Sequence, residues 1–149
     1  MSLEERIKKD LVTAMKAKDE VALRSIRAIK AAILLMKTDG SGQEIDEAKE
    51  VALVQKLVKS RQDSIDIYLK NGREELAKIE QEEVDILRNY LPKMLEGAEL
   101  EELVRGFIAQ TGASGPSDMG KVMGMASKQL AGKVEGRVLS ETVKRLLNS

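Results

Sequence analysis

The sequence predicts an all-α protein with an N-terminal four-helix bundle-like domain and a small three-helix C-terminal domain. Of the 149 residues, 34% are charged and 42% are hydrophobic, whereas 2% are aromatic and only 2 are proline. This composition favours helix formers over the β-branched and aromatic residues of strands. Apolar residues also recur at spacings of three and four, as on one face of a helix. The chain is long enough to bury a core without disulfide bonds.

The boundary between the two predicted domains lies between Pro92 and Ala98. Pro92 and Gly97 interrupt two helical patterns, and little apolar character lies between them. We therefore expect domains over residues 1–92 and 98–149.

The first two helices are predicted from their N-terminal caps. Ser2 and Glu5 have the spacing of a capping box, and Asp19 is placed to cap the second helix. The second helix is expected to end at a loop over residues 38–42, where two glycines interrupt the pattern. The expected buried residues of these helices are Leu3, Ile7, Leu11 and Met15, then Leu23, Ile26, Ile29, Ile33 and Leu34.

The third and fourth helices have predicted stop signals. The third is expected over residues 46–70, followed by Asn71 and Gly72 as a left-handed stop. The fourth begins at Arg73, and Pro92 ends it by forcing the preceding residue out of helical geometry. The expected buried residues are Val51, Val54, Leu57, Val58, Ile65, Tyr68 and Leu69, then Leu76, Ile79, Ile86, Leu87 and Tyr90.

Three further helices are expected beyond the boundary, over residues 99–110, 118–130 and from the turn at 132–136 to Leu147. Their apolar positions are Leu100, Leu103, Val104, Phe107 and Ile108, then Met119, Val122, Met123 and Met125, then Val138, Leu139, Val143 and Leu146.

Several classes of chemistry are excluded by composition. The chain has no histidine, cysteine or tryptophan. It therefore cannot supply a histidine base, a cysteine nucleophile, a disulfide or a zinc site of His and Cys ligands. No cofactor is expected. The N-terminal region lacks the apolar core of a signal peptide, and no stretch approaches the roughly 18 apolar residues of a membrane span. These absences lead us to expect a cytoplasmic protein without a membrane partner.

Charge is unevenly distributed although the formal net charge is +0. Residues 1–73 hold 15 basic and 12 acidic groups, residues 74–102 hold 3 and 10, and residues 103–149 hold 7 and 3. A surface of one sign that binds a partner and ordinary solvated helix faces both agree with this distribution.

The C-terminal region interleaves basic residues with glycines. Each glycine inside a helix costs roughly 1 kcal/mol relative to alanine, so these glycines need a structural reason. Close approach to a neighbouring helix is the expected reason at Gly124, and a turn requirement is expected at Gly132 and Gly136. Approach of main-chain amides to a phosphate backbone stays open as the alternative. The candidate phosphate contacts are Lys121, Lys128, Lys133 and Arg137, with backbone approach at Gly120, Gly132 and Gly136.

Several separated motifs resemble a known family. Residues 118–124 (DMGKVMG), 132–137 (GKVEGR) and 143–147 (VKRLL) resemble the C-terminal tail shared by the YqeY family and the B subunit of the tRNA-dependent amidotransferase. Further motifs are similar to stand-alone YqeY proteins: 23–32 (LRSIRAIKAA), 59–65 (KSRQDSI), 71–73 (NGR) and 90–93 (YLPK). The resemblance implies a two-domain helical protein whose C-terminal domain is related to one that packs against tRNA. It does not imply the amidation chemistry, whose sites lie in parts that this chain lacks.

Three functions follow as hypotheses. The first is a non-catalytic accessory module that binds tRNA or another structured RNA through backbone contacts, since Phe107, Tyr68 and Tyr90 are expected in the core. The second is an enzyme or a component that assists glutamine-dependent carbon–nitrogen ligation. Without histidine, only a lysine could serve as base for a serine nucleophile, and no motif indicates such a pocket. The third is a protein-interaction module, using the acidic fourth helix or a methionine cluster that is otherwise core filler. The candidate serines are Ser60, Ser64, Ser127 and Ser140, and the methionines are Met119, Met123 and Met125.

Overall fold

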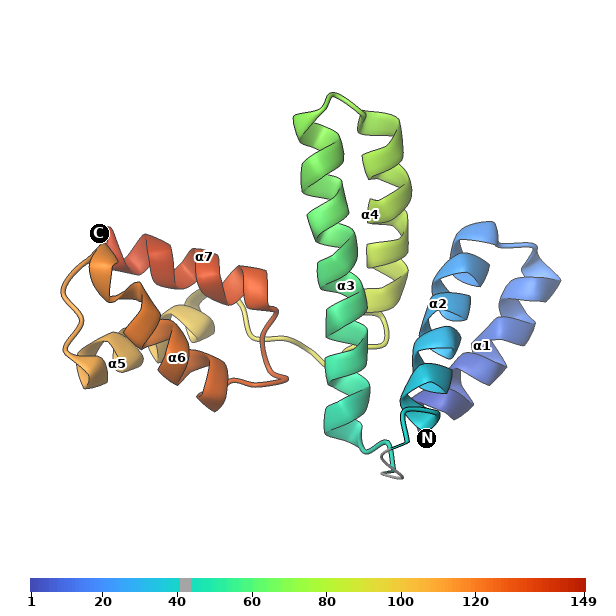
Figure 1. Cartoon of the computed structure of the whole chain (residues 1–149), viewed down its shortest axis with the longest axis horizontal. Coiled ribbons are helices and arrows are strands. Elements are labelled where there is room, and N and C mark those ends of the chain that lie inside the picture. Colours follow the sequence, from blue (N-terminus) through green and yellow to red (C-terminus); the bar gives the residue numbers. More distant parts are fainter. Residues whose placement is uncertain (41–43) are drawn as a thin grey trace. The chain divides into compact units, whose positions relative to one another are not determined.

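The computed structural model describes residues 1–40 and 44–149, and these contain seven α-helices, one short 3-10 helix and no strand (Figure 1). The all-α prediction is therefore confirmed. The predicted loop at residues 38–42 lies partly outside the described residues. Contacts within the chain divide it into two compact units, Met1–Pro92 and Lys93–Ser149.

The first unit contains four helices: α1 (Leu3–Ala17), α2 (Glu20–Lys37), α3 (Glu47–Lys70) and α4 (Glu74–Arg88). Their predicted caps are present. The Ser2 hydroxyl accepts from the N–H of Glu5 at 3.2 Å, and Asp19 Oδ1 accepts from the N–H of Ala22 at 3.1 Å. Asp46 caps α3 in the same way. Each cap satisfies a backbone donor that the first helical turn leaves unpaired.

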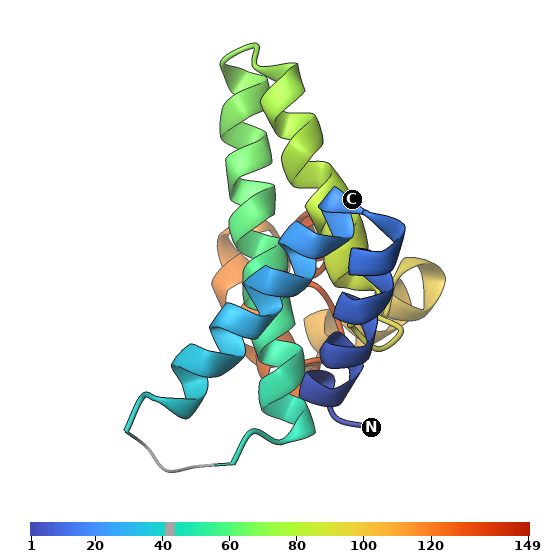
Figure 2. The same ribbon diagram turned by 90° about the vertical axis from the view of Figure 1, so that its right-hand side faces the viewer.

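These helices form two antiparallel hairpins, α1 with α2 and α3 with α4, and α2 crosses α3 obliquely (Figure 2). Helix α2 contacts both α3 and α4, so the core of the unit lies where the hairpins cross. Ile29, Val54, Val84 and Leu87 are fully buried there. The N–H of Leu3 also donates to the Glu50 carboxylate, which joins the start of α1 to α3.

Four residues predicted to be buried in this unit are largely exposed: Met15 at 58%, Leu34 at 62%, Leu69 at 54% and Ile79 at 45%. The predicted α1 stripe has a strict spacing of four residues. Because a helix turns once in 3.6 residues, such a stripe rotates by about 40° at each step and has left the core face at Met15. Ala14 is buried there instead.

The third and fourth helices end near the positions predicted from Gly72 and Pro92. Gly72 has a φ of +69°, in the left-handed region that favours glycine, and it separates α3 from α4. Helix α4 ends at Arg88, two residues before the predicted end, and turns with i→i+3 hydrogen bonds lead to Pro92. Tyr90 lies in these turns and is buried in the core, as predicted.

The second unit contains α5 (Gly97–Thr111), the 3-10 helix η1 (Pro116–Asp118), α6 (Met119–Gln129) and α7 (Gly136–Leu147). Leu100, Val104, Val122, Ala126 and Val143 are fully buried between its three α-helices. The second unit begins at Lys93, before the predicted start at residue 98, and two contacts of Leu95 explain this. Leu95 packs against its core, and the N–H of Leu95 donates to the Lys133 carbonyl at 2.8 Å. Independent folding of the two units stays a prediction.

Candidate functional site

Helix α6 presents an exposed face of glycine and lysine. Gly120, Lys121, Gly124 and Lys128 are all exposed, whereas Val122 and Ala126 on the opposite face are fully buried. Lys121 and Lys128 lie two turns apart on the same side of the helix, which corresponds to about 10 Å along its axis. Gly124 lies between them. This face thus carries two cations separated by bare backbone.

The glycines of this face have open space beside them. Apart from its chain neighbours and the nearby backbone of its own helix, a Cβ atom built at Gly120 or Gly124 has no heavy atom within 4 Å. The prediction that Gly124 admits a neighbouring helix is therefore wrong within this chain, because α5 and α7 pack on the other side of α6. The helix carries the propensity cost of Gly124 without any packing contact that explains it.

The turn between α6 and α7 brings the other two predicted contacts close in sequence. Gly132 has a φ of +77°, so the predicted turn requirement is confirmed there, and Lys133 follows it as an exposed residue. Arg137 is exposed in the first turn of α7, with its Nε 3.4 Å from Glu141 Oε1. Gly136 opens α7 and also has open space around its Cβ position. RNA contact by Lys121, Lys128, Lys133 or Arg137 stays a prediction.

Neighbouring acids neutralise part of the positive charge in this unit. Arg145 and Arg105 both pair with Glu101 of α5, and Lys121 Nζ lies 3.8 Å from Asp118 Oδ1. The N–H of Ser114 donates to Asp118 Oδ2 at 2.9 Å, and this bond lowers the pKa of the Asp118 carboxyl. Asp118 is therefore anionic at neutral pH. Lys128 and Lys133 are then the strongest candidates for contact with an anionic partner.

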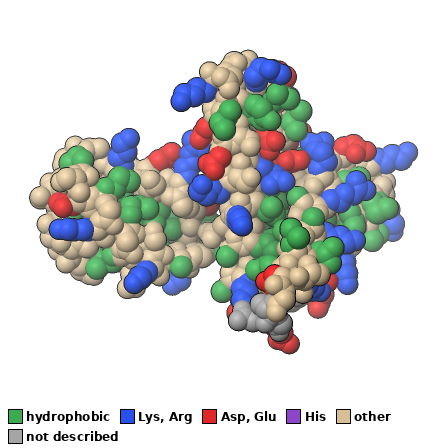
Figure 3. Space-filling view, viewed as in Figure 1, with side chains coloured by type: hydrophobic (Ala, Val, Ile, Leu, Met, Phe, Trp, Pro, Cys, Tyr) green, Lys and Arg blue, Asp and Glu red, His purple; other side chains and the backbone are tan. Residues whose placement is uncertain are grey.

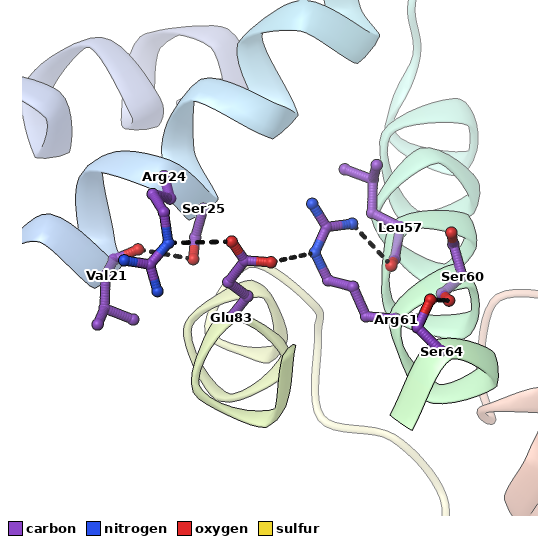
Figure 4. A network of polar contacts seen from close by, with 8 residues as sticks. All are labelled: Val21, Arg24, Ser25, Leu57, Ser60, Arg61, Ser64 and Glu83. Atoms are coloured by element: carbon purple, nitrogen blue, oxygen red, sulfur yellow. Dashed lines mark hydrogen bonds and ion pairs between the residues drawn. The ribbon is translucent and has the colours of Figure 1, made fainter. Parts of the chain in front are cut away.

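A second polar cluster lies in the first unit and joins three helices (Figure 4). Glu83 of α4 accepts from Arg24 Nε of α2 at 3.2 Å and from Arg61 Nε of α3 at 2.9 Å. The side chains of Glu83 and Arg61 are 13% and 17% exposed. Arg24 and Arg61 belong to two motifs of the resemblance, and the fold brings them to a single carboxylate. No pattern in the sequence distinguishes Glu83 from the many other acids on α4.

A third cluster lies where the first unit ends. The Tyr90 hydroxyl donates to Asp10 Oδ2 at 2.6 Å, and the Arg6 guanidinium lies 4.9 Å from the centre of the Tyr90 ring. Burial is the main cause that raises the pKa of Tyr90 well above its usual value, and the hydrogen bond to Asp10 adds to it. The phenol therefore stays protonated and holds α1 against the end of α4.

Among the described residues, the candidate serines form local contacts and no catalytic arrangement. The Ser64 hydroxyl donates to the Ser60 carbonyl at 3.2 Å, a local bond within α3. Ser60 and Ser127 are exposed and Ser140 is half-buried. Within residues 1–40 and 44–149, no group of three or more acidic residues is arranged to hold a metal ion.

Comparison with known sequences identifies the family. The profile of a family described as "Yqey-like protein" matches residues 4–147, which is nearly the whole chain. The chain belongs to this family. The resemblance of its separated motifs to YqeY proteins is thus confirmed.

Curated relatives of this Yqey-like protein carry the name "Altered inheritance of mitochondria protein 41, mitochondrial". The protein from Lachancea thermotolerans is 35% identical over 113 residues, which cover 74% of this chain and 60% of the relative. That from Vanderwaltozyma polyspora is 38% identical over 88 residues, covering 59% and 48%. That from Pyrenophora tritici-repentis is 30% identical over 148 residues, covering 97% and 80%. The chain thus spans 60% and 48% of the length of the first two of these relatives.

The prediction of a cytoplasmic protein is wrong, because these relatives are named as mitochondrial proteins. It depended on the absence of a signal peptide and of a long apolar stretch, and neither absence distinguishes the cytoplasm from a mitochondrion. None of the helices in the described part of the chain is long and apolar enough to cross a membrane.

Proposed function

We propose that this Yqey-like protein is a non-catalytic accessory module that binds tRNA or another structured RNA through its second unit. The observation that carries the proposal is the exposed face of α6. Gly120 and Gly124 leave the helix backbone uncovered there, and Lys121 and Lys128 flank it. An RNA phosphate can approach this backbone more closely than it could approach a helix covered with side chains.

The contacts expected on this face recognise the phosphate backbone. Lysine and arginine side chains are common protein contacts to phosphate groups, whereas main-chain amides inside a helix already donate to helical carbonyl groups. Phe107 and Tyr90 are each only 8% exposed, so they offer no platform for stacking unpaired bases. The described surface therefore favours recognition of a folded RNA by its shape and backbone, with little dependence on base sequence.

The strength of binding is set by the number of phosphates contacted. Lys121, Lys128, Lys133 and Arg137 would neutralise about four phosphates, which predicts a slope near −3 for log affinity against log salt concentration. This slope is low for a nucleic-acid-binding protein, so the affinity should be modest. Partial neutralisation of Lys121 by Asp118 and of Arg137 by Glu141 lowers it further.

Fluorescence anisotropy with labelled tRNA tests the proposal, and the tRNA pool should include mitochondrial tRNA because the relatives are mitochondrial by name. The test variant is Lys128→Glu with Lys133→Glu. The matched control is Lys9→Glu with Lys16→Glu on the exposed side of α1, which changes the net charge equally. We expect the test pair to lower the affinity for tRNA at least tenfold and the control pair to lower it only slightly. Equal losses of affinity in the two pairs would show that the binding is nonspecific electrostatic attraction. No binding at low salt would refute the proposal.

A further inference from the structure

An apolar groove with a basic rim runs between α1 and α2 in the first unit. Its floor includes Ile7 and Leu11 of α1 and Ile26 and Ile33 of α2, and Leu34 forms part of one edge. The cavity holds about 150 Å³. This volume is below the range of about 300–1,000 Å³ typical of ligand pockets, so the groove accommodates protruding side chains better than a whole small molecule.

Two exposed apolar residues, Val12 and Met15, continue the apolar surface of the groove along α1. Leu34 is 62% exposed, and Val12 and Met15 of α1 are 51% and 58% exposed. Val12 and Met15 follow Lys8 by four and seven residues, so helical periodicity places them on the same side of α1 as this lining residue. Figure 3 shows hydrophobic and basic side chains next to one another over these two helices. An apolar groove with exposed apolar residues at its edge and charged residues around it is typical of an interaction surface.

The charge of the lining is predominantly positive. Lys8, Lys30 and Lys37 line the groove together with one acid, Glu4. Lys37 Nζ lies 2.6 Å from Glu4 Oε2, so this pair is internally neutralised. Lys8 on α1 and Lys30 on α2 then give opposite walls of the groove a net positive charge.

The geometry points to a docking groove for one acidic amphipathic helix of a partner protein. The groove lining runs from Glu4 to Leu11 on α1 and from Ile26 to Lys37 on α2, about 10 Å and about 16 Å along the helix axes, so two to three turns of a docked helix fit in it. Apolar side chains of such a helix would enter between Ile7, Leu11 and Leu34. Its acidic side chains would meet Lys8 and Lys30. A concave groove suits the ridge of a helix better than the flat surface of a lipid bilayer.

This inference is separate from RNA binding, because it concerns another unit and another class of partner. The probe for its test is a capped, fluorescein-labelled peptide of about 18 residues with leucines at i, i+3, i+4 and i+7 and glutamates beside them. A second peptide carries lysine in place of every glutamate. The chain variants are Leu34→Ser and the charge reversal Lys8→Glu with Lys30→Glu. Their matched controls are Leu69→Ser, which is 54% exposed on α3, and Lys9→Glu with Lys16→Glu.

We expect the acidic peptide to bind the unaltered chain. Its affinity should fall at least tenfold in Leu34→Ser and in the charge-reversed chain. The lysine peptide should bind the charge-reversed chain more tightly than the unaltered one. Both controls should bind as the unaltered chain does, and circular dichroism should show equal helicity throughout.

Four results would overturn the inference. The first is no binding of the acidic peptide at about 1 mM. The second is an equal effect of Leu34→Ser and Leu69→Ser. The third is binding to phosphatidylglycerol–phosphatidylcholine vesicles that Leu34→Ser abolishes while peptide binding is unchanged, since this would assign the face to a lipid surface. The fourth is a dimer in sedimentation equilibrium that Leu34→Ser dissociates, since this would assign the face to a second copy of the chain.

Discussion

Replacing Gly124 by alanine should stabilise the second unit and weaken RNA binding at the same time. Gly124 lies inside α6, its φ is not positive, and a Cβ there meets no atom within 4 Å apart from its chain neighbours and the backbone of its own helix. Alanine therefore adds no clash and removes the entropic cost of glycine, a gain of about 1 kcal/mol in free energy of unfolding. If a phosphate backbone approaches this face, the added methyl group lies in its path, and RNA affinity should fall about threefold to tenfold.

Gly106 supplies a matched control, and Gly132 supplies a contrasting case. Gly106 lies inside α5 with the same open surroundings, so Gly106→Ala should give the same gain in stability and leave RNA affinity unchanged. Gly132 has a φ of +77°, so Gly132→Ala should lose about 1 kcal/mol through backbone strain.

Hydrogen exchange read by mass spectrometry over residues 97–111 and 119–129 measures the stability of the two helices separately. Anisotropy with labelled tRNA measures affinity. If Gly124→Ala leaves the protection of residues 119–129 from hydrogen exchange unchanged, the open geometry of α6 is contradicted. Increased protection with unchanged RNA affinity would refute the role of this face in binding.

Three further outcomes are expected. Burial raises the pKa of Tyr90 above its ordinary value of 10, so the folded chain holds that proton more tightly than the unfolded chain does. Stability of the first unit should therefore decline as pH rises above about 10, and Tyr90→Phe should reduce this decline in denaturant titrations across alkaline pH. Glu83→Gln should lower the free energy of unfolding by about 2–3 kcal/mol, because it leaves Arg24 and Arg61 without their shared carboxylate. Glu75→Gln, in a pair whose side chains are 59% and 68% exposed, should change it by no more than about 0.5 kcal/mol. Urea unfolding measures both. Limited proteolysis should cut first at residues 92–96 or 38–40, and early cuts inside α3 or α6, mapped by mass spectrometry, would contradict the proposed boundary.

Local signals predicted the helices well, because their causes lie within a few residues. The predicted caps at Ser2 and Asp19 require only a side chain and the backbone three residues on. The stop at Gly72 requires only a positive φ. Burial was less predictable, since it depends on which helix faces which. Leu34 follows Ile33 by about 100° around α2, and only the crossing of the hairpins determines that Ile33 is buried and Leu34 is exposed.

The candidate sites were also only partly predictable, because their geometry depends on how helices pack. The basic and glycine residues of α6 could be selected from composition, but the absence of a neighbour at Gly124 required the packing of the second unit. The meeting of Arg24, Arg61 and Glu83 joins residues up to 59 positions apart, and no spacing along the chain indicates it. The groove between α1 and α2 also depends on two helices and was missed for that reason.

The bond from Tyr90 to Asp10 has a consequence for the order of folding. It joins residues 80 positions apart, and the bond from Arg6 to the Asn89 carbonyl spans 83. The contacts inside each helical hairpin are far more local, and closing a short loop costs less conformational entropy than closing a long one. The hairpins should therefore form first, and docking of α1 against the end of α4 should come late. Substitutions at Asp10 or Tyr90 should then speed unfolding while leaving the refolding rate nearly unchanged.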